Sequence, residues 1–220
     1  MKAIFILFIF CTFICSCQPR NQHRTGQSAL VPSPENPSPD TLYQLLNGAL
    51  FKDSVTYDHY KPFLYIKTGH FLSADHKNAL LVRCPADTVF HVELYDMRDN
   101  KWVKTGEIDG LPAFPIQFDA LFYDYNFDGQ KDIFIQHTVS NGHALAYGHL
   151  LIVDPATQQP VYHAETKTLA NLRPDPVSKQ VFSEEVIYPQ GRERACMLTH
   201  KWINGQLQTV KKECPDKSLK

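Results

Sequence analysis

The segment from Asp124 to Asp132 has the residue types and spacing of a calcium-binding loop. Oxygen-bearing side chains occupy the first, third, fifth and ninth positions, and glycine occupies the sixth, where such a loop turns sharply. The twelfth position is Ile135, which cannot coordinate a cation, so the ninth residue must close the site. The expected Ca²⁺ ligands are the side chains of Asp124, Asn126, Asp128 and Asp132 and the backbone carbonyl of Gln130. The alternative is a polar turn whose Asx side chains bond their own backbone.

Patterns that would indicate an enzyme are missing from the sequence. It has no Gly-x-Ser-x-Gly, no phosphate-binding glycine loop and no dinucleotide fingerprint. Nothing fixes Asp175 and Glu184 as the pair of carboxylates, ~5–9 Å apart, that glycoside hydrolysis requires. His137, His143 and His149 are evenly spaced, but on β-structure this spacing does not bring three rings together. We therefore predict that the protein is not an enzyme and that Ca²⁺ is its cofactor.

The elements that must position these residues are mostly strands. Residues Thr41 to Phe51 have apolar side chains at helical spacing and predict one short N-terminal helix. The rest of the chain alternates or clusters apolar residues as strands do. The expected strands are Phe63 to Lys67, Ala79 to Arg83, Val89 to Tyr95, Lys101 to Glu107, Ile116 to Tyr123, Asp132 to Thr138, His149 to Val153, Val161 to Ala164, Gln180 to Ile187, Ala195 to Trp202 and Gln206 to Lys211.

A weak internal repeat joins these strands. Similar strand triplets begin near Leu80, Ile133 and Val181, at a period of about 50 residues that is typical of propeller blades. Residues 41–220 are therefore expected to form a single all-β domain, an antiparallel meander that is β-propeller-like. A β-sandwich is the alternative, because two packed sheets give similar local signals. Trp102 and Trp202 lie beside tight turns in equivalent repeats and are expected to be core aromatics.

The final hairpin predicts a disulfide. If Asn204 and Gly205 form a two-residue turn, the residue numbers of two cross-strand partners add up to 409. The numbers of Cys196 and Cys214 add up to 410, so these two cysteines are one residue out of register. A bulge or a looser turn would let these two cysteines face each other. We favour a Cys196–Cys214 disulfide with Cys84 free, and the alternative is that Cys84 takes one of the partners.

The N-terminus predicts export. Lys2 precedes an uncharged run from Ala3 to Ser16 that is too short to span a bilayer, so residues 1–16 are expected to be a signal peptide. The run ends in a sequence that resembles the bacterial lipoprotein box, with Cys17 as the lipidated residue. Ordinary secretory cleavage is the alternative. Residues 17–40 are rich in proline and poor in large apolar residues, which indicates a disordered tether.

The formal net charge of −1 over 220 residues excludes a basic surface of the kind that binds nucleic acid. Only short, mixed basic runs occur, at Lys211 and Lys212 and from Gly191 to Arg194. The membrane is therefore expected as a partner only through the lipid anchor. No acidic run follows the anchor, so we expect the protein in the cell envelope, on the outer membrane facing the periplasm.

The order of motifs from Leu121 to Cys214 resembles a group of secreted or lipid-anchored bacterial proteins. These proteins share an NFDG-x-x-D calcium loop, a Y-x-x-FDP-type turn and a terminal kW-x-NG-x-L hairpin. They are periplasmic lysozyme inhibitors and the immunity proteins that protect bacteria from peptidoglycan hydrolases of rival cells. The calcium loop matches residue by residue, whereas the turn matches only as Val153-Asp154-Pro155, without the preceding aromatic residue.

The resemblance implies a partner-binding loop after the calcium loop. Lysozyme inhibitors often carry a Ser-Gly-x-x-Tyr element that enters the hydrolase cleft. The corresponding residues here are Ser140, Asn141, Gly142, His143 and Tyr147, with an inserted Asn and a longer spacing. Hydrogen-bond donors on this loop would face the two carboxylates of a glycan hydrolase, and calcium next to it would stiffen the strand that presents it. The alternative is an ordinary hairpin turn.

These observations predict a calcium-binding envelope lipoprotein that inhibits lysozyme-like peptidoglycan hydrolases or confers immunity to them. The alternative is a glycan-binding or structural assembly lipoprotein on the same calcium-stabilised β scaffold, since such scaffolds serve several functions. Exposed aromatic residues in a groove would favour glycan binding, and a protruding polar loop would favour the inhibitor.

Overall fold

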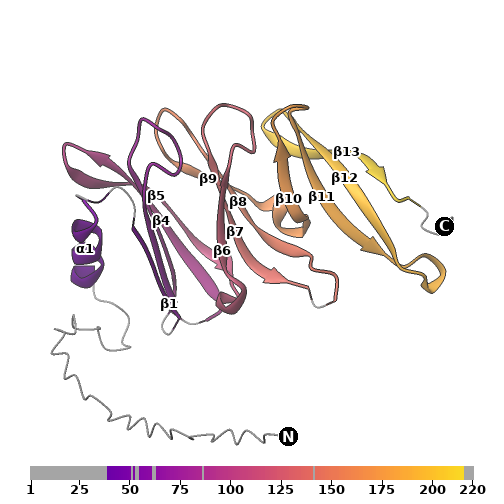
Figure 1. Ribbon diagram of the computed structural model, residues 1–220, viewed down its shortest axis with the longest axis horizontal. Coiled ribbons are helices and arrows are strands. Elements are labelled where there is room, and N and C mark those ends of the chain that lie inside the picture. Colours follow the sequence, from indigo (N-terminus) through magenta and orange to yellow (C-terminus); the bar gives the residue numbers. More distant parts are fainter. Residues whose placement is uncertain are drawn as a thin grey trace, which may run out of the picture. The chain divides into compact units, whose positions relative to one another are not determined.

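The computed structural model describes residues 39–50, 52, 55–60, 63–85, 87–140 and 142–215 (Figure 1). The predicted signal peptide, the anchor Cys17 and nearly all of the predicted tether lie outside the described residues. Within them the chain forms one α-helix, thirteen strands and three short 3-10 helices. No helix in this part of the chain is long and apolar enough to cross a membrane.

The strands form three antiparallel sheets, and in each sheet the strand order follows the chain order. Sheet A contains β1 (Val55–Tyr60), β2 (Phe63–Gly69), β3 (Asn78–Cys84), β4 (Val89–Arg98) and β5 (Lys101–Pro112). Sheet B contains β6 (Asp119–Tyr123), β7 (Asp132–Val139), β8 (Ala146–Val153) and β9 (Pro160–His163). Sheet C contains β10 (Ala170–Asp175), β11 (Gln180–Ile187), β12 (Arg194–Ile203) and β13 (Gln206–Glu213). The predicted all-β class with one short helix is confirmed.

The weak sequence repeat corresponds to these sheets. The three similar triplets are β3 to β5, β7 to β9 and β11 to β13, the last three strands of each sheet. The strands β1 and β10 were not predicted, and the strand before the calcium loop begins later than the predicted Ile116. Pro115 begins a 3-10 helix, η1 (Pro115–Gln117), so β6 starts only at Asp119. Ala164, predicted at the end of a strand, begins η2 (Ala164–Thr168) instead.

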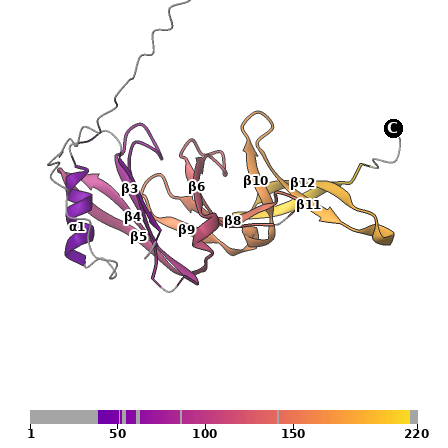
Figure 2. The same ribbon diagram turned by 60° about the horizontal axis from the view of Figure 1, so that its bottom comes forward.

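Sheet B lies between sheets A and C (Figures 1 and 2). The core contains one apolar layer on each face of sheet B. Ile133 and Ile135 of β7 pack toward sheet A, and Phe134 between them packs toward sheet C. Successive side chains of a strand point to opposite faces, which explains the unbroken apolar run at the start of β7. Three stacked sheets replace the two-sheet sandwich that was the alternative prediction.

A third apolar cluster joins the helix α1 (Pro39–Gly48) to the opposite face of sheet A. The indole N–H of Trp102 donates to the carbonyl of Leu46 at 2.8 Å, and Lys77 Nζ donates to the carbonyl of Leu50 at 2.8 Å. Leu50 lies two residues after the helix ends at Gly48, so Lys77 holds the turn that follows the helix. The helix begins two residues before the predicted start, because proline is well suited to the first helical position.

The C-terminal hairpin contains the predicted register shift. The residue numbers of paired residues add up to 409 from Ile203 and Gln206 to His200 and Thr209. A bulge then shifts the register by one residue, and from Thr199 onward the paired numbers add up to 410. This shift places Cys196 opposite Cys214, and the two form a disulfide. Cys84 is free and buried.

Candidate functional site

The predicted calcium loop connects β6 to β7 and alternates between two environments. Tyr125 is fully buried and Phe127 is partly buried, both in the apolar layer between sheets B and C. The intervening Asp124 and Asn126 are partly exposed, and Asp128 is exposed. The Tyr125 hydroxyl donates to the carbonyl of Leu172 at 3.4 Å. Aromatic anchors therefore hold the polar residues of the loop at the surface.

Side-chain oxygens of this loop accept hydrogen bonds from its own backbone. Asp124 accepts from the amides of Asp128 at 3.2 Å and Gly129 at 3.0 Å, and Asn126 accepts from Asp128 at 3.1 Å. Asp128 accepts from the amide of Gln130 at 2.8 Å. Gly129 has a φ of +95°, the left-handed conformation that glycine adopts without strain. The sharp turn expected at the sixth position is present.

Asp132 occupies a different place from the other predicted ligands. It is fully buried at the start of β7, and its two oxygens accept from the amides of Tyr125 at 2.8 Å and Val153 at 2.9 Å. Burial raises the pKa of Asp132 to about 7, although the two amide hydrogen bonds oppose this shift. Asp132 therefore links the calcium loop to the end of β8 through these two hydrogen bonds.

The oxygen-bearing side chains of the loop suit calcium, which prefers carboxylate, amide and carbonyl oxygens. Asp124, Asn126 and Asp128 present such oxygens within one turn, and the two oxygens of the buried Asp132 each accept one amide hydrogen bond and have a further lone pair. Over the described residues, no group of three or more His, Cys, Asp or Glu side chains is placed to hold a metal ion. A calcium ion here would rely on Asn126 and on backbone carbonyls as well as on carboxylates.

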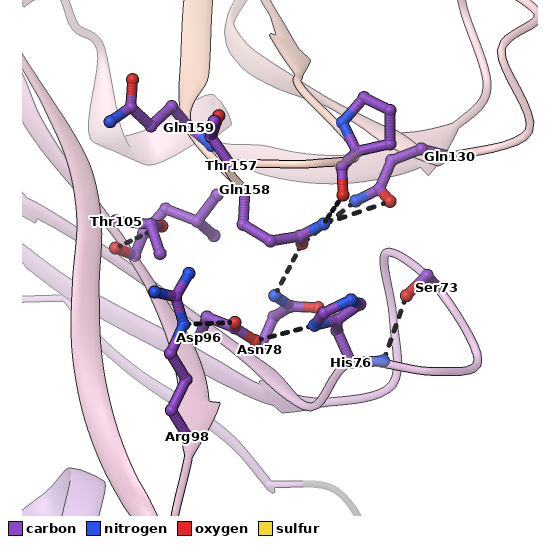
Figure 3. A network of polar contacts seen from close by, with 12 residues as sticks. Ser73, His76, Asn78, Asp96, Arg98, Thr105, Gln130, Thr157, Gln158 and Gln159 are labelled. Carbon is purple, nitrogen blue, oxygen red and sulfur yellow. Dashed lines mark hydrogen bonds and ion pairs between the residues drawn. The ribbon is translucent and has the colours of Figure 1, made fainter.

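Gln130 links the calcium loop to sheet A through a buried amide network (Figure 3). Its Nε2 donates to Gln158 Oε1 at 3.2 Å, and Asn78 Nδ2 donates to the same oxygen at 3.2 Å. Gln158 and Asn78 are fully buried, and Asn78 Oδ1 has no hydrogen-bond partner. The amide of Lys131 also donates to the carbonyl of Leu72 at 3.0 Å. The side chain of Gln130 therefore has a structural role that sequence reasoning, which used only its carbonyl, did not foresee.

The predicted partner-binding loop connects β7 to β8, and few contacts hold it. The amide of Ser140 donates to the carbonyl of Leu145 at 2.8 Å, and Ser140 Oγ accepts from the amide of Leu145 at 3.4 Å. The amide of Ala146 donates to Asn171 Oδ1 at 2.8 Å. Asn141 lies outside the described residues, and Gly142 is exposed with a φ of +95°. The loop is fixed at its two ends.

His143 connects this loop to the β11–β12 turn. Its Nε2 lies 2.6 Å from the hydroxyl of Tyr188, and its Nδ1 lies 3.5 Å from a carboxylate oxygen of Glu193. Tyr188 and Glu193 were not predicted, because nothing in the local sequence links them to a residue so far away in the chain. Tyr147 is separate from the loop, since it lies within β8 opposite Thr138.

The two loops lie at opposite ends of β7, because one precedes Asp132 and the other follows Val139. Eight residues of strand span roughly 25 Å. The expectation that calcium would lie next to the partner-binding loop is wrong, and any effect of calcium on that loop must pass along β7 and its neighbours.

Two of the three evenly spaced histidines meet between the loops. The rings of His137 and His149 stack with centroids 4.6 Å apart, and His143 lies elsewhere on the loop. His149 Nε2 lies 2.8 Å from the carbonyl of Pro112 and its Nδ1 lies 3.2 Å from the hydroxyl of Tyr162. Burial lowers the pKa of His149 to about 4, so the ring is neutral at pH 7. Both nitrogens are engaged within the protein.

Comparisons of this chain with protein-family models, with curated proteins and with solved structures found no match.

Proposed function

We propose that this protein is a calcium-binding lipoprotein of the bacterial cell envelope that inhibits peptidoglycan hydrolases of the lysozyme type or confers immunity to them. The observation that carries this proposal is the loop from Ser140 to Leu145. Its ends are fixed by hydrogen bonds, and its central polar residue, His143, is held by Tyr188 and Glu193. A loop with ordered ends and polar side chains loses little entropy when it enters a cleft.

The chemistry of such a cleft explains the side chains. A glycan hydrolase holds two carboxyl groups, one an acid and the other a base or nucleophile. Ser140 has a hydroxyl proton to donate to a carboxylate, and His143 would exchange its 3.5 Å contact with Glu193 for a carboxylate of the hydrolase. Tyr188, exposed beside His143, adds a phenol that the resemblance did not include. Tyr147 contributes through strand pairing that fixes the end of the loop.

Calcium would act as a structural cation in this proposal. Asp124, Asn126 and Asp128 would bind it, with the Gln130 carbonyl and Asp132 as further ligands. When bound, the ion supplies positive charge that neutralises the carboxylates of the loop. Tyr125 and Phe127 anchor that loop between two sheets, so calcium would stabilise the support of β7.

The propeller-like interpretation and the cellular location are also part of the proposal. Three four-strand meanders in chain order, repeating at about 50 residues, are what three propeller blades would contribute, with β1 as an additional strand of sheet A. Lipidation at Cys17 would anchor the domain to the outer membrane facing the periplasm, and residues 18–38 would hold it off the bilayer.

The test is peptidoglycan turnover by a panel of lysozyme-type hydrolases with stoichiometric protein added, in calcium and in chelator. Inhibition of a panel member by the parent protein, weakened at least tenfold by His143→Ala, is the expected result. His91→Ala is the matched control, because His91 also pairs with a carboxylate but lies on sheet A. Absence of inhibition across the panel would shift the proposal to a glycan-binding or assembly lipoprotein.

A further inference from the structure

A pocket of about 220 Å³ lies between α1 and the face of sheet A that the helix covers. The helix contributes Leu42, Tyr43 and Leu46 to its lining. The sheet contributes Arg83 from β3, Glu93 and Tyr95 from β4, and Lys104 from β5. The pocket is thus apolar on one side and polar on the other. Neither of the loops at the ends of β7 contributes to it.

The polar side consists of paired charges. Arg83 Nη2 donates to Glu93 Oε1 at 2.8 Å, and the hydroxyl of Tyr95 donates to the other oxygen of Glu93. Lys104 forms an ion pair with Glu107. The positive charges are therefore matched by negative ones, and the pocket offers both donors and acceptors without a strong net charge. Arg83 Nε is buried and has no hydrogen-bond partner, so this guanidinium is incompletely satisfied by the protein.

The apolar side is held rigidly. Leu42 and Leu46 are buried against sheet A, and the Trp102 indole bonds the carbonyl of Leu46. Lys77 donates to the carbonyls of Ala49 and Leu50, in the turn just after the helix. The Tyr43 ring, in contrast, is 59% exposed at the rim of the pocket. A ligand would therefore meet a formed pocket with the Tyr43 ring at its rim.

We propose that this pocket binds a single neutral pyranose sugar. A sugar ring has an apolar face of C–H groups, which suits Leu46 and the two tyrosine rings, and a rim of hydroxyl groups. Each hydroxyl both donates and accepts, and it can therefore bond a carboxylate such as Glu93 and a cation such as Arg83 or Lys104. The volume is below the 300–1,000 Å³ typical of drug-sized sites, as expected for one sugar ring.

The binding assay uses the purified protein with glucose and N-acetylglucosamine as probes, followed by ligand-detected NMR and calorimetry. We expect saturable binding with a Kd on the order of 1 mM, the weak affinity typical of a small polar ligand. Tyr43→Ala removes an exposed ring and should weaken binding at least fivefold without lowering Tm. Tyr123→Ala removes a ring of similar exposure, 52%, on sheet B and should leave binding unchanged.

A second pair of variants tests the polar side. Arg83→Gln should weaken binding at least tenfold, whereas Arg173→Gln, which removes another arginine paired with a glutamate, should not. Lack of saturation by both sugars at tenfold the expected Kd overturns the proposal. Tighter binding of glucuronic acid than of glucose overturns the assignment to a neutral sugar. The assay contains no hydrolase, so its outcome is independent of the inhibitor proposal.

Discussion

The two loops at the ends of β7 are built in different ways. In the loop before β7, side-chain oxygens from within the loop bind its backbone amides, and two aromatic residues anchor it in the core. In the loop after β7, the ends are bonded to each other and to Asn171, and the central His143 depends on Tyr188, 45 residues away in sequence. The conformation of the loop before β7 is determined largely by its own residues, whereas the loop after β7 is positioned by residues distant in the sequence.

This difference indicates that the loop before β7 stabilises the fold and that the loop after β7 is suited to binding a partner. A loop that bonds its own backbone and buries aromatic rings between two sheets contributes to the stability of the folded state. A loop whose middle is held by exposed side chains contributes little to stability, but it can present those side chains to a partner. Changes in the first loop should therefore affect the folded state most, and changes in the second should affect local order and binding.

Asp132→Ala should have the largest effect on stability. It leaves the buried amides of Tyr125 and Val153 without acceptors, at a cost of about 4 kcal/mol in the free energy of unfolding. Urea denaturation of the variant and the parent measures this cost. Asp119→Ala, an exposed aspartate of β6 that also accepts one amide hydrogen bond, should cost less than about 1 kcal/mol. Equal losses in the two variants would contradict the role of Asp132 as the base of the loop.

The strand pair between the loops should weaken in acid through His149. Its folded pKa of about 4 lies below the ordinary 6.5, so the unfolded chain binds more protons between these values and stability falls as the pH drops through this window. The expected loss is up to about 3 kcal/mol. Asp132, whose pKa is raised to about 7, gives the opposite trend in the same range.

The difference between the parent and His149→Phe cancels Asp132, which is present in both proteins, and gives the contribution of His149 together with its coupling to the stacked His137. Urea unfolding of each protein from pH 4 to pH 7 gives this difference. It should change by up to about 3 kcal/mol across the range. A difference that does not vary with pH would show that His149 is equally easy to protonate in the folded and unfolded states.

Calcium should stabilise the protein through the loop before β7, and it should have no effect on Tm once the ligand Asp128 is removed. At a concentration 100 times its Kd, calcium adds about 2.7 kcal/mol to the free energy of unfolding, which raises Tm by roughly 5–10 °C. Asp128→Ala should abolish this rise, whereas Asp154→Ala, in a turn outside the loop, should retain it. An identical Tm of the parent protein with and without calcium would contradict the proposed site.

Tyr188→Phe should have the smallest effect on stability, below about 0.5 kcal/mol, because Tyr188 is an exposed residue. It removes the hydroxyl that contacts His143, so amide hydrogen exchange at Gly142 and Ala144 should become faster. Exchange in the first loop should not change. If the two loops respond alike, the loops are coupled along β7 and their separation into support and recognition fails.

Sequence reasoning predicted the features that depend on neighbouring residues. The glycine turn at Gly129 followed from local spacing, and the need for a one-residue register shift followed from the turn at Asn204 and the positions of the two cysteines. Whether a bulge or a looser turn makes this shift was open, and the structure has a bulge between Thr199 and His200. Features that depend on tertiary packing were not predicted from the sequence. The burial of Asp132 beneath the loop and the contact of His143 with Tyr188 required sheets B and C to be in place.

Some missed features did leave a signal in the sequence. Tyr125 and Phe127 alternate with the predicted ligands, which indicates that one side of the loop faces the core. The strand β10 left a weaker signal, because its ladder with β11 is irregular and it contains Pro174. The pocket beneath α1 could not be foreseen, since it forms only where the helix meets three strands of sheet A.

Sheet B is apolar on both faces, and these two faces become covered at different stages of synthesis. As synthesis proceeds from the N-terminus, sheet A is complete first, and sheet B can then cover its apolar layer. The face of Phe134 and Leu150 is fully covered only after the residues up to Leu207 have been added. If the chain is exported unfolded, as proposed, sheets B and C are both available when folding begins, and the disulfide between Cys196 and Cys214 then closes the last hairpin.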